Sequence, residues 1–93
     1  MTDKTGVIPL SKPISAHGET LEELEIGQPT GEQVCNFGLP YTMSQDMEVS
    51  INMKVVKRYI MALAKIPSSS VDQITPSDLN TIAWAIAGFF LKG

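Results

Sequence analysis

The sequence predicts a small α+β domain, with an N-terminal β-hairpin followed by a small, mainly helical bundle. Two observations lead to this class. Apolar and polar residues alternate with a period of two in the first third of the chain, whereas apolar residues recur three and four positions apart after Asn52. The 93 residues are 43% hydrophobic, which is enough for one core. We expect a single domain over 1–93, with a disordered tail at 1–6, the hairpin at 7–27 and the helical part at 28–93.

The hairpin is predicted from two alternating segments, 7–12 and 19–26, which flank a turn-rich stretch at 15–18. Apolar side chains share one face of the strands and carboxylates the other: Ile8, Leu10, Leu24 and Ile26 against Glu23 and Glu25. Pro9 cannot donate to a ladder, so it places the first strand at a sheet edge. Because a lone hairpin is marginally stable in water, we expect it to pack on the helices or on another subunit.

A short helix follows the hairpin. Thr30 and Gln33 have the spacing of a capping box, and Gly38 and Pro40 end the pattern. Residues 41–50 show no period, so we expect a loop there. Its two methionines, Met43 and Met47, are flexible apolar side chains suited to filling gaps or to making contacts.

A longer helix is predicted over Asn52–Ile66, which Pro67 ends. Its apolar stripe comprises Val55, Val56, Tyr59, Ile60, Leu63 and Ile66, and its opposite stripe comprises Lys54, Lys57, Arg58, Met61 and Lys65. The basic stripe suits either a solvated face or an acidic partner, with Met61 as an apolar contact among the charges. Ser69–Asp72 has a further capping pattern, which opens one helical turn to Ile74.

The terminal helix begins with Thr75 as its cap, Pro76 in its first turn and Asp78 at the position that closes a capping box. One apolar stripe comprises Leu79, Ile82, Ala83, Ile86, Phe89 and Phe90, and a second comprises Trp84, Ala87 and Leu91, shared with Asn80. Two apolar stripes exceed what one small core covers. We therefore expect one stripe in the core and the other against a partner.

Catalysis finds little support in the sequence. The single histidine, His17, lies in the predicted turn, where histidines are ordinarily solvated. The single cysteine, Cys35, lies beside Phe37 and is expected to be a small buried apolar residue. No metal-ligand spacing, phosphate-binding loop or nucleophile motif is found. We expect no enzyme activity, no cofactor and no metal.

Charge and cysteine content limit the partners and the compartment. The formal net charge is −3, which argues against nucleic acid as the main partner. A small DNA-associated regulator that uses the basic helix 52–66 remains the alternative function. One cysteine and no apolar signal core fit a reducing cytoplasm. The apolar run Ile82–Leu91 is about half of the ~20 residues that span a membrane, so no membrane span is expected.

Four segments in a fixed order carry a resemblance to a known family. They are Ile26-Gly27-Gln28-Pro29-Thr30-Gly31, the run from Ala64 to Ile74, Asp78-Leu79, and Ala87-Gly88-Phe89-Phe90. Together they resemble the short tail assembly chaperones of Mu-like and P2-like long-tailed phages, over roughly residues 8–90.

The resemblance implies a non-enzymatic chaperone of the bacterial host cytoplasm. It would bind the long helical tape measure protein and keep it soluble while the tail tube forms, with the tail tube protein as a further possible partner. The resemblance also implies a longer product made by ribosomal frameshifting. We expect self-association, since many copies must coat one tape. The residues expected to bind the tape measure or another copy are Trp84, Ala87, Phe89, Phe90, Leu91 and Met61.

Overall fold

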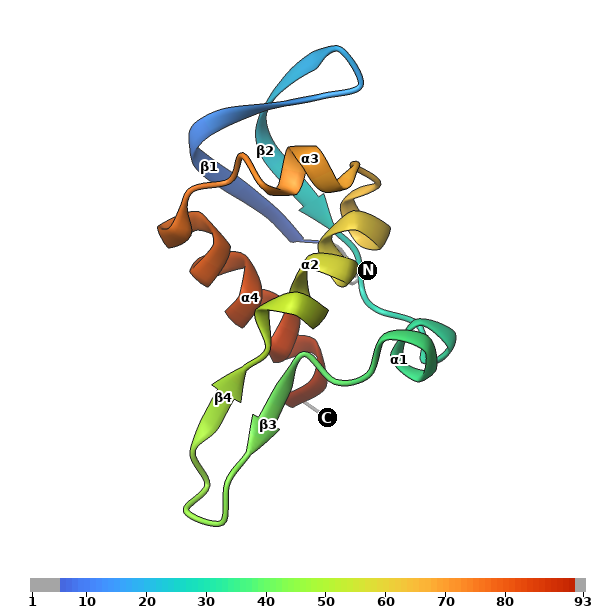
Figure 1. Cartoon of the computed structure of the whole chain (residues 1–93), viewed down its shortest axis with the longest axis vertical. Helices are drawn as coiled ribbons and strands as arrows, with labels where there is room; N and C mark the ends of the chain where they lie inside the picture. The colour runs from blue at the N-terminus through green and yellow to red at the C-terminus, as the bar shows by residue number, and fades with distance from the viewer. Residues whose placement is uncertain (1–5, 92–93) are drawn as a thin grey trace, which may run out of the picture.

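The computed structural model describes residues 6–91, without the side chain of Leu91. It confirms a mixed α+β fold that begins with an antiparallel hairpin (Figure 1). The elements are β1 Gly6–Ala16, β2 Glu19–Ile26, α1 Gly31–Phe37, β3 Tyr41–Met43, β4 Val49–Ile51, α2 Met53–Ala64, α3 Ser68–Val71 and α4 Pro76–Leu91. Of the tail expected at 1–6, residues 1–5 lie outside the described residues, and Gly6 begins β1.

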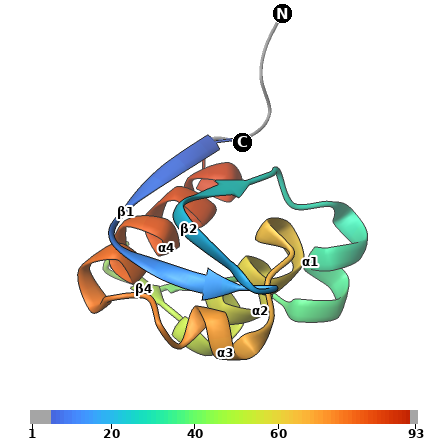
Figure 2. The ribbon, with the colours of Figure 1, turned by 90° about the horizontal axis from the view of Figure 1, so that it is seen from above.

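The first hairpin covers one side of the helices (Figure 2). Strand β2 packs on α2, and β1 packs on α3 and α4. The expected inward face is confirmed, and it buries five apolar side chains: Ile8, Ile14, Ala16, Leu24 and Ile26. The two turn residues His17 and Gly18 both have positive φ, 53° and 77°, which matches the twist of a tight hairpin. The register shifts between Pro9 and Ile14, where β1 bends over the helices.

Polar side chains from α3, α4 and the segment between them fasten the outer edge of β1. The amide of Gln73 accepts from the Ser15 backbone N at 2.8 Å and donates to the Ser15 carbonyl at 3.1 Å, to which Ser70 Oγ also donates at 2.6 Å. Farther along, the Ser11 backbone N and Oγ donate to Asp78 Oδ2 at 2.8 and 2.9 Å. An unpaired strand edge invites pairing with other chains, and these bonds close it.

The carboxyl of Asp78 is held in its charged form at this edge. Burial alone would raise its pKa, but hydrogen bonds from Ser11, Thr75 and the Lys12 backbone outweigh that effect and hold the pKa below its ordinary 3.8. The helix start differs here from the expected capping box. Thr75 Oγ1 accepts from the Asp78 backbone N at 3.3 Å, as expected, but the Asp78 carboxylate binds β1. This side chain therefore joins the first hairpin to α4.

The core lies between the hairpin, α2 and α4. Its buried helical and connecting side chains are Val56, Tyr59, Ile60, Ile66, Val71, Ile74, Ile82, Ala83 and Ile86. Tyr59 lies at its centre. The centroid of its ring is 5.1 Å from that of Phe37 and 5.8 Å from that of Phe90, both in edge-to-face geometry. Burial raises the pKa of the Tyr59 phenol, and Cys35 adds in the same direction. The hydroxyl donates to the Gly38 carbonyl at 2.5 Å, so the phenol joins α1 to the core.

Residues 41–50 form the base and tip of a second hairpin, so the expected loop is wrong. Strands β3 and β4 pair antiparallel and project from the body (Figure 1). We call Tyr41–Ile51 the arm. Its base is held by the buried Pro40, whose carbonyl accepts from the Asn52 backbone N at 2.8 Å. Strands of three residues are too short to show an alternating pattern, so periodicity could not indicate them.

Of the three other expected helix starts, two agree with the structure and one does not. The capping box of Thr30 and Gln33 forms in full at α1, and Asn52 caps α2. Helix α3 instead begins at Ser68 after Pro67, without a side-chain cap. The serines here serve tertiary contacts, because the Ser70 hydroxyl is bonded to β1.

Candidate functional site

Helix α4 is half enclosed by the fold. It packs on β1, α2 and β4, and the residues that turn toward them are fully buried: Ile82, Ala83, Ile86 and Ala87. The opposite side consists of Ser77, Asn80, Thr81, Trp84 and Ala85, all exposed, and Gly88, which is half-buried. We call these six residues the α4 face. It presents a continuous helical surface because 3.6 residues per turn bring them onto one side.

The α4 face lacks charge. Among the 16 residues of α4 the one ionisable residue is Asp78, which is turned to β1. Trp84 is 45% exposed, and small or short side chains surround it. A Cβ added at Gly88 would meet nothing within 4 Å, so the surface there is open. A solvent-facing helix surface ordinarily carries charged residues. An uncharged face with a central tryptophan is instead typical of a protein contact.

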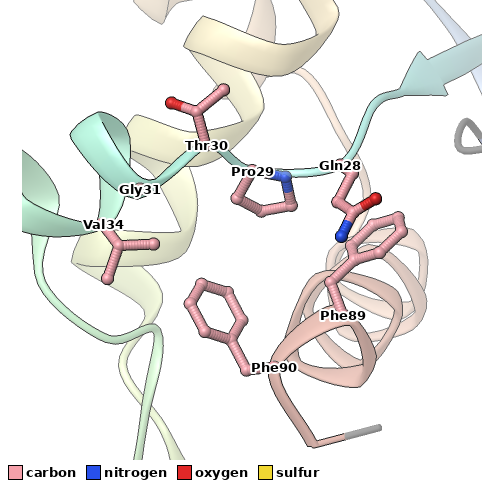
Figure 3. Close-up of a pocket in the computed structure, with 7 residues that line it drawn as sticks. All are labelled: Gln28, Pro29, Thr30, Gly31, Val34, Phe89 and Phe90. Atoms are coloured by element: carbon pink, nitrogen blue, oxygen red, sulfur yellow. The ribbon is translucent and has the colours of Figure 1, made fainter. Parts of the chain in front are cut away.

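An aromatic hollow of about 170 Å³ lies near the C-terminal end of α4 (Figure 3). It is lined by Gln28, Pro29, Thr30, Gly31, Val34, Phe89 and Phe90. Figure 3 shows the rings of Phe89 and Phe90 rising from α4 on one side, with the chain that enters α1 on the other. The Phe90 ring also lies 6.1 Å from Tyr41. The capping box fixes the entry of α1, so the hollow has a defined wall on that side.

The structure places the residues expected to contact a partner at separate sites, and only Phe89 and Phe90 of them lie together. Trp84 is exposed, and the half-buried Phe89 and Phe90 meet in the aromatic hollow. The expectation for Ala87 is wrong, because Ala87 is fully buried. The core arc of α4 is wider than one stripe, since three elements pack around the helix. The side chain of Leu91 lies outside the described part of the chain.

Met61 belongs to a different place. It lies on α2 and lines a second hollow, of about 330 Å³, with Phe37, Arg58, Ala62 and Ile66. We call it the α1–α2 hollow, because its lining comes from α1, α2 and Ile66, which follows α2. None of its lining residues belongs to α4. Met61 therefore does not extend the surface around Trp84.

The sequence did not indicate Gln28, Pro29 and Val34 as site residues. The local signal there, the capping box of Thr30, predicts a helix start and nothing more. Its neighbours form a site because α1 lies near the end of α4, about 60 residues later in the chain. Nothing in the periodicity of either segment encodes that approach.

The remaining candidate residues have structural surroundings. His17 is exposed, and its Nε2 lies at hydrogen-bonding distance, 3.1 Å, from the Lys65 carbonyl, which ties the hairpin turn to the end of α2. Cys35 is exposed rather than buried, because α1 turns Val34 and Phe37 inward. Over residues 6–91 no three His, Cys, Asp or Glu side chains gather as a metal site would require. No helix in that range could cross a membrane.

The basic stripe of α2 is partly neutralised. Lys57 Nζ lies 2.7 Å from Asp72 Oδ1, whereas Lys54, Arg58 and Lys65 are exposed. A nucleic-acid surface needs several unpaired cations in a row. One cation of this stripe is thus paired with a carboxylate, and three remain exposed.

Comparison with known protein families gives a match over nearly the whole chain. Residues 7–91 match the family described as phage tail assembly chaperone proteins, E, or 41 or 14. Comparisons with curated proteins and with solved structures gave no significant match. Apart from Gly6 at the start of β1, the match covers the two hairpins and four helices of the described residues. The chain belongs to the phage tail assembly chaperone family.

Proposed function

We propose that this chain binds the tape measure protein and keeps it soluble while the tail tube assembles, in the bacterial cytoplasm and without catalysis. Membership of the family supports a role in tail assembly and implies binding of tail proteins. The observation that supports this partner is the α4 face, an uncharged helical surface with Trp84 at its centre. Long helices with apolar faces aggregate unless they are covered, and a helix face is well suited to cover them.

The energetics fit a reversible contact. Complete burial of one large apolar side chain contributes about 1.5–3 kcal/mol. Trp84 is already about half-buried in the free chain, so it would add only part of that amount. A single site is therefore weak, and many copies along one tape would together hold it. Weak individual contacts also allow the growing tube to displace the chaperone.

The aromatic hollow gives the contact a second part. Phe89 and Phe90 leave a space open to solvent at the end of α4, into which an apolar side chain of the partner would fit. Trp84 does not line this hollow, and Phe89 and Phe90 lie about 120–140° around α4 from Trp84. The hollow would therefore receive a second segment of the partner, and two anchors on different sides of α4 would fix how the partner lies against the helix.

Co-expression with the tape measure protein of the same phage or prophage tests the proposal. We expect a soluble complex, which Trp84→Ala should weaken without loss of the fold. Gly88→Glu is a second variant that the fold tolerates, since a Cβ meets nothing there, and it places a charge on the α4 face. Val7→Ala is the matched control, because Val7 is 52% exposed but lies on the first hairpin.

The outcome is judged from solubility and from copurification together. An insoluble tape measure that retains no chaperone would contradict the proposed partner. A soluble complex that Trp84→Ala and Gly88→Glu leave unchanged would preserve the partner and contradict the surface.

A further inference from the structure

The tip of the arm presents one methionine in an unusual backbone conformation. The Met47 backbone N donates to the Ser44 carbonyl at 3.0 Å, and the Ser44 backbone N donates to the Glu48 carbonyl at 2.9 Å. Ser44 Oγ also accepts from the Glu48 backbone N at 3.1 Å. These bonds hold Met47 at φ 65°, in the left-handed region. The tip is therefore a defined turn.

Methionine is an unfavourable choice at this position. Left-handed φ places Cβ close to the carbonyl oxygen, so glycine or asparagine is the usual residue there in hairpin turns. Met47 is also the most exposed of the large hydrophobic side chains that the structure describes, at 74%. Both features disfavour methionine in the free chain. A backbone outlier with an exposed apolar side chain points to a contact made elsewhere.

The charges beside Met47 indicate what kind of surface it meets. Asp46 and Glu48 flank it in sequence, and both are exposed. The tip is thus an apolar side chain between two carboxylates. Its complement is an apolar depression with a cation at its rim.

The α1–α2 hollow has this chemistry. Phe37, Met61, Ala62 and Ile66 give it an apolar lining, and Arg58 contributes a guanidinium. The Phe37 wall is fixed by its edge-to-face contact with the buried Tyr59. The volume of about 330 Å³ is ample for one methionine side chain.

We propose that the arm tip of one copy docks in the α1–α2 hollow of a second copy. Met47 enters the hollow, and Asp46 and Glu48 pair with Arg58. The occupant is another copy because a single chain carries both halves, with opposite charges. Each chain has one tip and one such hollow, so the contact is either reciprocal in a dimer or repeats from copy to copy. This contact goes beyond the proposed function, since it needs no tape measure protein.

Sedimentation velocity of the purified chain alone, over a range of concentrations, tests the contact. We expect concentration-dependent self-association that weakens with added salt, because ion pairs at a surface are screened. Met47→Gly should weaken the association constant roughly ten- to a hundredfold, the effect of removing one buried side chain. The same change should preserve or raise the urea midpoint, because glycine accepts this φ without strain. Met53→Ala, which removes another exposed methionine, is the control.

Charge reversal distinguishes this contact from general apolar association. Arg58→Glu should weaken association, whereas Lys54→Glu, the same change on the same helix outside this hollow, should have little effect. Association should return when Arg58→Glu is combined with Asp46→Lys and Glu48→Lys. A chain that stays monomeric at all concentrations would overturn the proposal, as would association that Met47→Gly and Arg58→Glu leave unchanged.

Discussion

The first hairpin and the arm are both two-stranded antiparallel sheets, yet only the first is fastened to helices along its length (Figure 1). One face of the first hairpin is buried, and the backbone of Ser11 and Ser15 at its edge is bonded to side chains of the helical part. The arm is attached at its base, and its Met43 and Met47 are exposed. The first hairpin therefore supports the fold, whereas the arm is available for contacts.

The largest expected difference is in the free energy of unfolding, between truncating a buried side chain of the first hairpin and truncating an exposed side chain of the arm. Leu24 is 2% exposed and Met43 is 46% exposed. Leu24→Ala should lower the free energy of unfolding by about 2–5 kcal/mol, because it leaves a cavity in the core. Met43→Ala should change it by less than about 0.5 kcal/mol. Urea unfolding followed by circular dichroism measures both, and equal losses would contradict the contrast.

Asp78 gives the attachment of the first hairpin a dependence on pH. Its folded-state pKa is lowered, so its carboxylate stabilises the fold above the unfolded-state value and that contribution is lost as the pH falls through the folded-state pKa. Asp78→Asn should be less stable than the unmodified chain at neutral pH, and the difference should shrink below pH 3.8. Asp46→Asn makes the same chemical change on the exposed arm tip and is the control. Urea midpoints from pH 7 to pH 2 would show the difference, and a gap that stays constant would contradict it.

Gln73 is expected to protect the backbone at the outer edge of β1 from solvent. Gln73→Ala removes its two hydrogen bonds with the Ser15 backbone, each of which contributes about 0.5–1.5 kcal/mol. Amide hydrogen exchange at Ser15 should become faster, since its N–H loses its acceptor. Gln45→Ala, at the arm tip, is the control. Unchanged exchange at Ser15 would mean that Gln73 does not close the edge in solution.

A small, local effect is expected at the base of the arm. Tyr41→Leu removes the edge-to-face contact with Phe90, which is worth about 0.5–1.5 kcal/mol. Hydrogen exchange should become faster in β3 and β4 while β1 and β2 stay protected. Equal acceleration in both hairpins would show that the arm is not an independent unit.

The same contrast explains how much of the fold the sequence could predict. Leu24 and Ile26 alternate with Glu23 and Glu25 because one face of the first hairpin is buried, and that burial imposes the pattern. No residue of the arm is fully buried, and its strands of three residues are too short for an alternating pattern to be recognised. A glycine at position 47 would have indicated a turn, because glycine is the usual residue at positive φ. Methionine gives no such signal, so the turn could not be predicted.

The candidate site was predictable in part for a similar reason. Trp84 stands out because one tryptophan on a second apolar stripe is visible in a single helix. Ala87 was misplaced because the width of the buried arc depends on how many elements surround α4. The hollow beside Phe90 depends on the approach of α1, which no local pattern encodes.

The central claim is that the α4 face contacts the tape measure protein, and the emission of Trp84 tests it most directly. Trp84 is the one tryptophan of the chain, so its fluorescence reports on this face alone. Helical segments of the tape measure protein that lack tryptophan would be titrated into the chaperone. Binding should shift the emission to shorter wavelength and protect it from acrylamide quenching, because the ring leaves water. A complex that forms with unchanged Trp84 emission would contradict the claim.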